Sequence, residues 1–408
     1  MKLRPHQKKF GKKMLKILTK HNIVYLAGEV RSNKTGTALY CADIYEAKHV
    51  LFISKKSALS SVEKDYKAFG FSFKLTTINY ASLHKTPQHN YDLVIYDECH
   101  SLGKFPKPSK RTKQAKQMFY DIPCILMSGT PSVESYSQLY HQFYVSKFSP
   151  FNQYKNFYKW AKVYVDKKEL RLPTHTVTDY SHAKVDVVDK VIKPLMVTMT
   201  QQDAGFTTEI NEKKLYVEVP KLIKNLTDKL LNDRVIEGKT GFIFGDAPAK
   251  LQSKTHQLFN GHCIIEKANG DTFTKVLSTY KVDYIKKHFK GLKIAILYYY
   301  QAEREMLESA FDLAQNIDEF NTTDKNIAIQ FNSTEGMNVS KADCLVYLNL
   351  GFSGKNWIQS RDRMTIKERK SNDIYIICDK NGITEKIYNQ VSKKLNFNSR
   401  QFMKEYGF

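Results

Sequence analysis

A loop with phosphate-binding spacing follows the first apolar run of the chain. Residues 28–35 read Gly-Glu-Val-Arg-Ser-Asn-Lys-Thr, between the run 23–27 and a helix-like segment. They match the pattern G-x-x-x-x-G-K-[ST], except that Asn33 replaces the second glycine. In such a loop, backbone N–H groups at a helix N-terminus face the phosphates, Lys34 neutralises charge and the Thr35 hydroxyl reaches Mg²⁺. Asn tolerates positive φ, so Asn33 is compatible with this conformation; a solvated strand–helix turn is the alternative.

Two carboxylates close a second apolar run. Asp97 and Glu98 follow residues 93–96 and precede Cys99 and His100. Phosphoryl transfer needs an acid that holds magnesium through water, and a neighbouring carboxylate that orients or deprotonates the attacking water. Alone, such a pair is usually a solvated turn. Here it lies downstream of a phosphate loop, and Ser128-Gly129-Thr130-Pro131 follows a further apolar run, which together favour phosphate chemistry.

Eight short apolar runs alternate with helix-like segments, which is typical of parallel strands buried on both faces. They are Ile23–Ala27, His49–Ser54, Leu93–Asp97, Cys124–Ser128, Ile294–Tyr300, Ile327–Phe331, Leu345–Leu350 and Ile374–Asp379. Four precede residue 130 and four follow residue 290, and the chain between them looks irregular. The pattern predicts an α/β protein with two lobes.

Composition narrows the class of partner. The 408 residues include 64 Lys and Arg against 41 Asp and Glu, a formal charge of +23. This excess favours a polyanion, nucleic acid before membrane. Hydrophobic residues at 42% exclude a disordered chain. We expect a soluble intracellular protein, because neither a signal peptide nor a run of about 20 apolar residues is visible. We also expect the six cysteines to be reduced and mostly in the core, because no C-x-x-C pair occurs.

The order of these motifs resembles the superfamily 2 helicases and translocases, within them the Swi/Snf-like group and its compact phage forms. The resemblance covers nearly the whole chain. Leu3–Gln7 is similar to the adenine-reading Q motif, Lys34 and Thr35 to motif I, residues 97–100 to the DExH form of motif II, and residues 128–131 to motif III. Motifs Ia and Ib, which contact the DNA backbone, are expected at residues 51–56 and 77–80.

Weaker motifs continue the resemblance after residue 290. Residues 293–300 resemble motif IV, 333–339 motif V, and 359–363 motif VI, whose arginines reach the γ-phosphate. Residues 382–385 resemble the helix start that closes Swi/Snf-type second lobes, and Glu218-Val219-Pro220 the first strand entering that lobe. The resemblance therefore implies two RecA-like lobes with parallel sheets, 1–205 and 206–408, and an ATP cleft between them.

The resemblance also implies roles for individual residues. Glu98, Asp97 and Arg363 would be catalytic, Thr35 and Asp97 would hold Mg²⁺ through water, and His100, Ser128 and Thr130 would couple hydrolysis to movement. The residues implied in ATP binding are Arg4, Gln7, Gly28, Ser32, Asn33, Lys34, Thr35, Thr37, Gly336, Asn338 and Gln359.

Two positions depart from the family pattern. Asn33 stands in the phosphate loop, and Ile366 stands where motif VI has its second arginine. An arginine finger contributes several powers of ten to phosphoryl transfer, so its loss affects hydrolysis more than binding. Arg361 or Arg369 could replace it.

A basic run directly after motif II is a candidate nucleic-acid surface. Residues 104–116 contain six basic residues and no acid, in a segment we expect to be a proline-punctuated loop. A solvated face is the alternative to phosphate contacts. The candidate nucleic-acid residues are Lys55, Lys56, Lys104, Lys107, Lys110, Arg111 and Lys113.

The aromatic stretch 148–164 predicts a helix that packs an aromatic face into a core, with base stacking as the alternative. The remaining histidines, His141, His175, His182, His256 and His262, show no metal-ligand spacing, so Mg²⁺ arriving with ATP is the only metal expected.

The sequence thus predicts an ATP-dependent DNA helicase or translocase in the cytoplasm, in the host cytoplasm if the gene is a phage gene. The expected partners are single-stranded, duplex or branched DNA and a replication, recombination or nuclease protein; no membrane is expected, and the motor would be a monomer on DNA. Two alternatives stay open: a nucleotide-switched DNA-binding protein with weak or lost ATPase, and the motor subunit of a nuclease complex.

Overall fold

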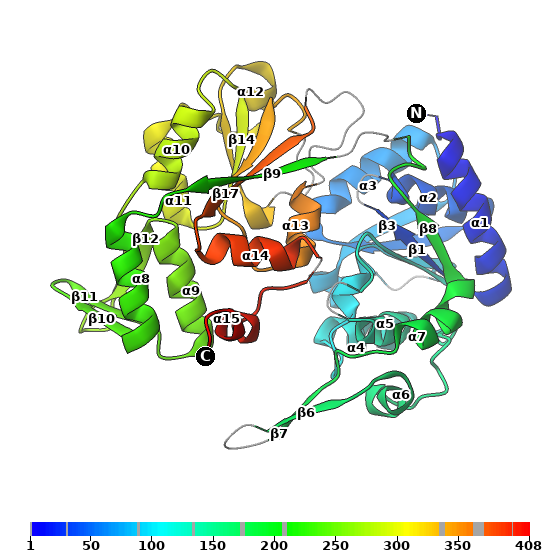
Figure 1. Ribbon diagram of the computed structural model, residues 1–408. Helices are drawn as coiled ribbons and strands as arrows, with labels where there is room; N and C mark the ends of the chain where they lie inside the picture. Colours follow the sequence, from blue (N-terminus) through cyan, green and yellow to red (C-terminus); the bar gives the residue numbers. More distant parts are fainter. Residues whose placement is uncertain are drawn as a thin grey trace. The chain divides into compact units, whose positions relative to one another are not determined.

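The structure is a computed structural model that describes residues 2–29, 32–87, 90–132, 135–171, 176–205, 210–333, 339–361, 371–393 and 395–408. The chain divides into two compact units, Met1–Thr207 and Thr208–Phe408, each described by itself (Figure 1).

Unit 1 is built on a six-stranded parallel sheet with the order β3-β2-β4-β5-β1-β8. The strands are β1 (Ile23–Gly28), β2 (His49–Ser54), β3 (Lys74–Asn79), β4 (Leu93–Tyr96), β5 (Cys124–Ser128) and β8 (Met196–Met199). Alternate residues of the central strands enter two separate cores: Leu51 and Ile53 face one, and Val50 and Phe52 face the other. Burial on both faces explains why these strands are continuous apolar runs.

Helices cover both faces of this sheet. They are α1 (Pro5–His21), α2 (Lys34–Ile44), α3 (Lys56–Phe69), α4 (Lys110–Phe119), α5 (Ser137–Phe143), α6 (Phe157–Tyr164) and α7 (Val185–Ile192), with 3₁₀ turns η1 (Tyr80–Lys85), η2 (Cys99–Leu102) and η3 (Lys193–Leu195). A two-stranded hairpin, β6 (Lys168–Arg171) and β7 (Thr176–Asp179), follows α6.

Unit 2 has a five-stranded parallel sheet with the order β15-β14-β16-β17-β9. The strands are β9 (Asn211–Val217), β14 (Ile294–Tyr298), β15 (Ile327–Gln330), β16 (Cys344–Tyr347) and β17 (Asp373–Asp379). Its helices are α8 (Lys221–Asp233), α9 (Pro248–Phe259), α10 (Tyr280–His288), α11 (Gln301–Ala310), α12 (Ile317–Thr322), α13 (Gly354–Arg361), α14 (Ile383–Val391) and α15 (Ser399–Glu405), with η4 (Phe331–Ser333).

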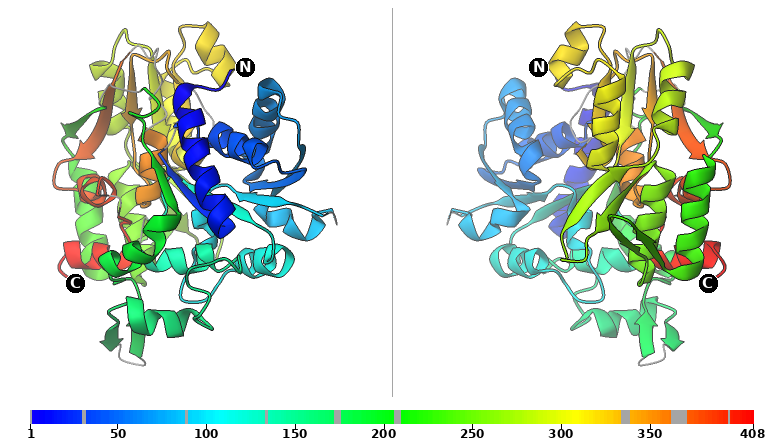
Figure 2. Two further views of the ribbon diagram at one scale, coloured as in Figure 1. Left: turned by 90° about the vertical axis from the view of Figure 1, so that its right-hand side faces the viewer. Right: turned by 90° about the vertical axis from the view of Figure 1, so that its left-hand side faces the viewer.

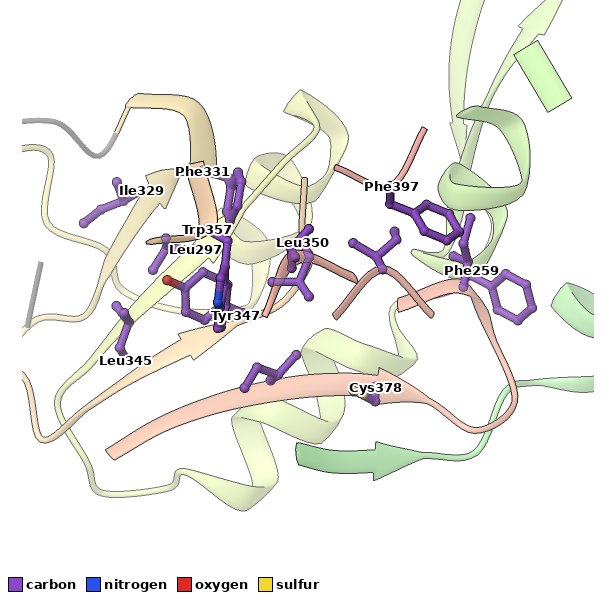
Figure 3. Close-up of a cluster of buried hydrophobic side chains, with 14 of the residues drawn as sticks. Phe259, Leu297, Ile329, Phe331, Leu345, Tyr347, Leu350, Trp357, Cys378 and Phe397 are labelled. Atoms are coloured by element: carbon purple, nitrogen blue, oxygen red, sulfur yellow. The ribbon is translucent and has the colours of Figure 1, made fainter. Parts of the chain in front are cut away.

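The larger core of unit 2 centres on buried aromatic side chains. Trp357 of α13 packs against Tyr347 of β16, with ring centroids 4.8 Å apart, and Phe331 lies beside them (Figure 3). The same cluster extends to Phe259 and Phe397, which tie α9 and the segment before α15 to the sheet (Figure 3).

The predicted α/β class with parallel sheets is confirmed, and β2 and β5 have the predicted ends. The expectation of an irregular middle segment is wrong. It contains α5 to α10 and a second sheet of unit 2, in which β10 (Val235–Gly238), β11 (Gly241–Phe244), β12 (His262–Glu266) and β13 (Thr272–Val276) pair antiparallel. The first strand of unit 2 also ends at Val217, before the predicted Glu218.

The described residues include no helix with both the length and the apolar character needed to cross a bilayer. All six cysteines lie in described segments, buried and without disulfides, as predicted.

Candidate active site

Three strand ends bring distant residues of unit 1 to one edge of the sheet. β5 lies between β1 and β4, and all three run parallel. The loop to Lys34 leaves β1, Ser128 ends β5, and Asp97 follows β4. The carboxyl edge of an open α/β sheet is where such folds bind ligands.

The loop after β1 is tightly folded in its described residues. A Cβ on Gly28 would lie 3.1 Å from both Lys34 Cβ and Ser32 Oγ, so a larger residue would require Lys34 and Ser32 to shift by a few tenths of an ångström. The Ser32 hydroxyl donates to the Glu29 carbonyl at 2.7 Å. Val30 and Arg31 lie outside the described residues. Gly28 and Ser32 therefore shape the loop through packing and a local hydrogen bond.

Asn33 occupies the left-handed backbone region, with φ 62° and ψ 37°. This is the conformation that a glycine adopts most easily and that Asn tolerates better than most residues. The chain then enters α2 at Lys34. The first N–H groups of a helix have no intrahelical acceptor, so the start of α2 can donate to an anion.

Thr35 is half-buried in the first turn of α2, and Thr37 is fully buried. The Thr37 hydroxyl donates to the Asn33 carbonyl at 3.1 Å. Thr37 therefore fixes the loop to the helix, a structural role beside the predicted ligand role.

Asp97 is 6% exposed, and both oxygens of its carboxylate accept hydrogen bonds. Oδ2 accepts from the Ser54 hydroxyl at 2.7 Å and Oδ1 from the Glu98 N–H at 2.9 Å. Burial raises the pKa of Asp97 to about 6, and the Glu98 charge adds to the rise, while Lys34 and Ser54 oppose it. A cation beside Asp97 would relieve this crowding of negative charge.

Glu98 has a left-handed backbone, with φ 48° and ψ 42°. For a non-glycine residue this conformation costs on the order of 1–2 kcal/mol, and such residues cluster at active sites. It turns the chain from β4 into η2, so that successive side chains, Asp97 and Glu98, reach the same edge of the sheet.

A chain of polar contacts leads from Lys34 to Thr130. Lys34 Nζ lies 3.7 Å from Glu98 Oε1, and His100 Nδ1 lies 3.2 Å from Glu98 Oε2. His100 Nδ1 is also 2.8 Å from Ser128 Oγ, which accepts the Thr130 N–H at 3.0 Å. The arrangement joins the residues after β1, β4 and β5 into one network.

The side chain of Gln7, in the first turn of α1, packs against α2. Its Oε1 accepts the Arg4 N–H at 2.8 Å, and a Cβ on Gly36 would lie 2.5 Å from its Nε2. Gln7 is 3% exposed, whereas the Arg4 side chain is exposed. The amide proposed to read adenine therefore packs against the helix that begins with Lys34.

The candidate nucleic-acid lysines lie on the surface of unit 1. Lys55 is half-buried at the N-cap of α3, and Lys56 is exposed. Lys104, Lys107, Lys110, Arg111 and Lys113 are all exposed. The predicted loop is wrong from Lys110 onward, because α4 begins there, with the Ser109 hydroxyl accepting the Thr112 N–H. Lys116 instead packs over the Tyr144 ring at 3.5 Å.

Several candidates of unit 2 lie outside the described residues: Gly336, Asn338, Arg363, Ile366 and Arg369. Gln359 is described and is 6% exposed on α13. Arg361 Nη1 lies 3.1 Å from Glu212 Oε1. An ion pair within unit 2 therefore holds the arginine that could replace the missing one of motif VI.

The residues that support the acid pair are not apparent from the sequence motifs. Ser54 holds Asp97, and the Tyr80 hydroxyl donates to the Asp97 carbonyl at 2.6 Å. Below them the Tyr25 hydroxyl donates to Gln142 Oε1 at 2.7 Å, and Cys99 Sγ donates to Tyr25. A polar residue ending a buried strand was a usable signal for Ser54, whereas no spacing points to Gln142.

The predicted aromatic core is confirmed, although helix α6 covers only Phe157–Tyr164. Phe151, Phe157, Trp160 and Tyr164 are buried. His141, His256 and His262 are buried as well, and desolvation lowers their pKa values to about 4, 3 and 4. Within the described ranges, no three His, Cys, Asp or Glu side chains gather as metal ligands would.

Comparison with solved structures identifies the fold. The Hef helicase domain of Pyrococcus furiosus matches with a TM-score of 0.50 at 12% identity, over 95% of this chain and 97% of that chain. The chain therefore has the fold of this helicase domain. Each unit is accordingly a RecA-like lobe. The SWI2/SNF2 ATPase core domain of Sulfolobus solfataricus matches at 14% identity with a TM-score of 0.42, over 95% of this chain and 88% of that chain. No protein-family profile and no curated protein matches the sequence.

Proposed function

We propose that the protein is an ATP-dependent DNA motor, a helicase or translocase of the Swi/Snf-like group. The observation that carries the proposal is the convergence of Lys34, Asp97 and Glu98 at the carboxyl edge of one parallel sheet. A cation at a helix N-terminus beside two carboxylates is what nucleoside triphosphate hydrolysis needs. The helicase-type fold supports the proposal.

ATP with Mg²⁺ fits the residues of this edge. The free N–H groups at the start of α2 and Lys34 suit phosphates, and Gly28 leaves space for the lysine stem. Magnesium usually takes one or two carboxylates and the substrate phosphates, so Thr35 and Asp97 suffice on the protein side. Bound there, Mg²⁺ would neutralise negative charge on the phosphates.

The protein's own groups then have defined roles. Lys34 would orient the phosphates, and Glu98 would position and deprotonate the attacking water. Through their contacts, His100 and Ser128 would transmit a movement of Glu98 on hydrolysis to β5 and Thr130, and from there to the DNA-binding surface. Lys55, Lys56 and the exposed basic residues between 104 and 113 would hold the DNA backbone.

Nucleic-acid-stimulated ATP hydrolysis tests the proposal. We expect duplex or single-stranded DNA to raise the rate for the wild type and not for Lys34→Ala. Lys48→Ala, an exposed lysine of the same unit, is the matched control. If the protein binds ATP but does not hydrolyse it at saturating DNA, the motor proposal is wrong and a nucleotide-switched DNA-binding protein is favoured. If it hydrolyses ATP only together with a co-purifying nuclease, it is the motor subunit of a nuclease complex.

A further inference from the structure

The outer side of α1 carries a dense group of lysines. Residues 2–22 contain seven lysines and Arg4, and no aspartate or glutamate. Six of the lysines lie within α1, and all six are exposed: Lys8, Lys9, Lys12, Lys13, Lys16 and Lys20. We refer to these six as the lysine face.

The lysine face points to solvent because the opposite side of α1 is buried in the core. At about 100° per residue, the six lysines fall within an arc of about 140°. Phe10, Met14 and Leu18 lie opposite and are 4%, 0% and 0% exposed in the core shared with β1 and α2. In the left view of Figure 2, no other segment of unit 1 lies in front of α1.

Nearby acids do not neutralise this charge. In the described part of the chain, none of the ion pairs includes a lysine of the face. Asp203 is within electrostatic reach: hydrogen bonds from Thr200 lower its pKa most, and Lys9 and Lys13 lower it further. Like charges four residues apart destabilise a helix by about 0.2–0.5 kcal/mol per pair. The face contains four such pairs, three in the row from Lys8 to Lys20 and one between Lys9 and Lys13, so its charge opposes folding.

The chemistry of the face favours nucleic acid over a membrane. A helix that lies in a lipid interface needs a free apolar side to insert. The apolar side of α1 is buried in the protein, so only charge is offered to a partner. A helix of 17 residues is about 26 Å long, and a duplex presents one phosphate charge per about 1.7 Å of axis, hence roughly 15 alongside it.

We infer that the lysine face is a nucleic-acid docking surface that binds the phosphate backbone without reading sequence. It is distinct from Lys55, Lys56 and the basic residues of 104–113, which follow β2 and η2. The inference rests on the proposed function for the identity of the polyanion, but it requires neither nucleotide nor hydrolysis.

The test measures the salt dependence of binding to a mixed-sequence duplex without nucleotide. The variant is the full chain with Lys12→Gln, Lys16→Gln and Lys20→Gln, which removes one row of the face away from Arg4 and Gln7. For duplex DNA the slope of log K against log salt is about −0.9 per phosphate contact. Three lost contacts would make the slope shallower by roughly 2.7. The matching Lys→Arg variant should keep the wild-type slope.

The control removes the same charge elsewhere. Lys286, Lys287 and Lys290 are exposed lysines of unit 2, and their change to Gln should leave the slope unchanged. An unaltered slope in the α1 variant, or an equal loss in the control, would overturn the inference. So would an α1 variant that loses only its binding to phosphatidylserine vesicles.

The outcome is separable from that of the proposed function. Lys34→Ala should lose ATP hydrolysis and keep the salt slope, whereas the α1 variant should keep its hydrolysis rate without DNA. If the wild type hydrolyses no ATP, the proposed motor function is wrong, but the salt-slope measurement still tests the lysine face.

Discussion

The Lys34 ammonium group and the Glu98 carboxylate lie 3.7 Å apart, although β5 separates β1 and β4, the strands that precede them in the chain. Their side chains are 13% and 17% exposed, so the pair is only partly screened by water. A phosphate that arrives at this site would compete with the Glu98 carboxylate for the Lys34 ammonium group. The same carboxylate that we propose activates water thus also holds the phosphate-binding lysine before nucleotide arrives.

Glu98→Gln should separate nucleotide binding from hydrolysis. The amide cannot act as a base, so we expect turnover to fall by about 10²–10⁴-fold. ATP affinity should stay or rise, because the negative charge that competes for Lys34 is removed. Fluorescent nucleotide titration and steady-state turnover measure the two effects. Glu46→Gln is the control: it is an exposed glutamate that also has positive φ, at 59°. Equal losses of binding and turnover would contradict the assignment.

Asp97 should set an acid limit on activity. Its pKa is raised from 3.8 to about 6, so the carboxyl becomes protonated below about pH 6 and a proton then competes with magnesium. We expect the magnesium concentration needed for half-maximal turnover to rise below that pH. A magnesium requirement that stays constant from pH 7 to pH 5 would count against Asp97 as the magnesium-holding acid.

The same shift affects stability in the nucleotide-free protein. A raised folded-state pKa gives a stabilisation that is present below about pH 3.8 and lost as the pH rises through about 6. Asp97→Asn removes the buried charge, and its amide can still donate to Ser54 and accept from Glu98. We expect it to abolish turnover yet raise the unfolding free energy at pH 7 by up to about 3 kcal/mol. Denaturant unfolding at pH 5 and pH 8 measures this, and a destabilised variant at pH 8 would refute it.

Asn33 should tolerate glycine and reject alanine. Asn33 has a left-handed backbone conformation. Adopting it costs any residue other than Gly, Asn or Asp on the order of 1 kcal/mol. Asn33→Ala should therefore weaken ATP binding and lower stability by about that amount, while Asn33→Gly keeps both near wild type. Titration and thermal unfolding of the two variants check this. If both variants lose ATP binding and stability equally, the Asn33 side chain and not its backbone conformation determines these properties.

Ser128→Ala should uncouple hydrolysis from DNA. It removes the hydroxyl that contacts His100 and accepts the Thr130 N–H, at a stability cost of about 1 kcal/mol. We expect basal turnover to persist and its stimulation by DNA to fall. Ser135→Ala is closely matched, because Ser135 is a buried serine that also accepts an N–H two residues on, from Ser137. The same loss of stimulation in both variants would make the effect structural.

The central strands were readable from sequence because burial on both faces makes them continuous apolar runs. β2 and β5 were predicted to the residue. β3 was missed because Lys74–Asn79 is an edge strand with mixed polarity. The antiparallel sheet was missed because its strands are short and only partly buried, as in Thr272–Val276.

Site residues were predictable where the chemistry requires a local motif, as for Lys34, Asp97 and Glu98. Their supports come from other strands and helices. Ser54 meets Asp97 only because β2 pairs with β4, and Gln142 meets Tyr25 only when α5 packs on the sheet. The start of α4 carried a usable signal, since Ser109 is a good N-cap residue after Pro108.

The most direct test of the motor is ATP-dependent displacement of the third strand of a triplex from duplex DNA, beside strand release from a fork. We expect displacement by the wild type with ATP and Mg²⁺, and none by Glu98→Gln or with a non-hydrolysable ATP analogue. Wild-type protein that binds the DNA and ATP but displaces neither strand would contradict it.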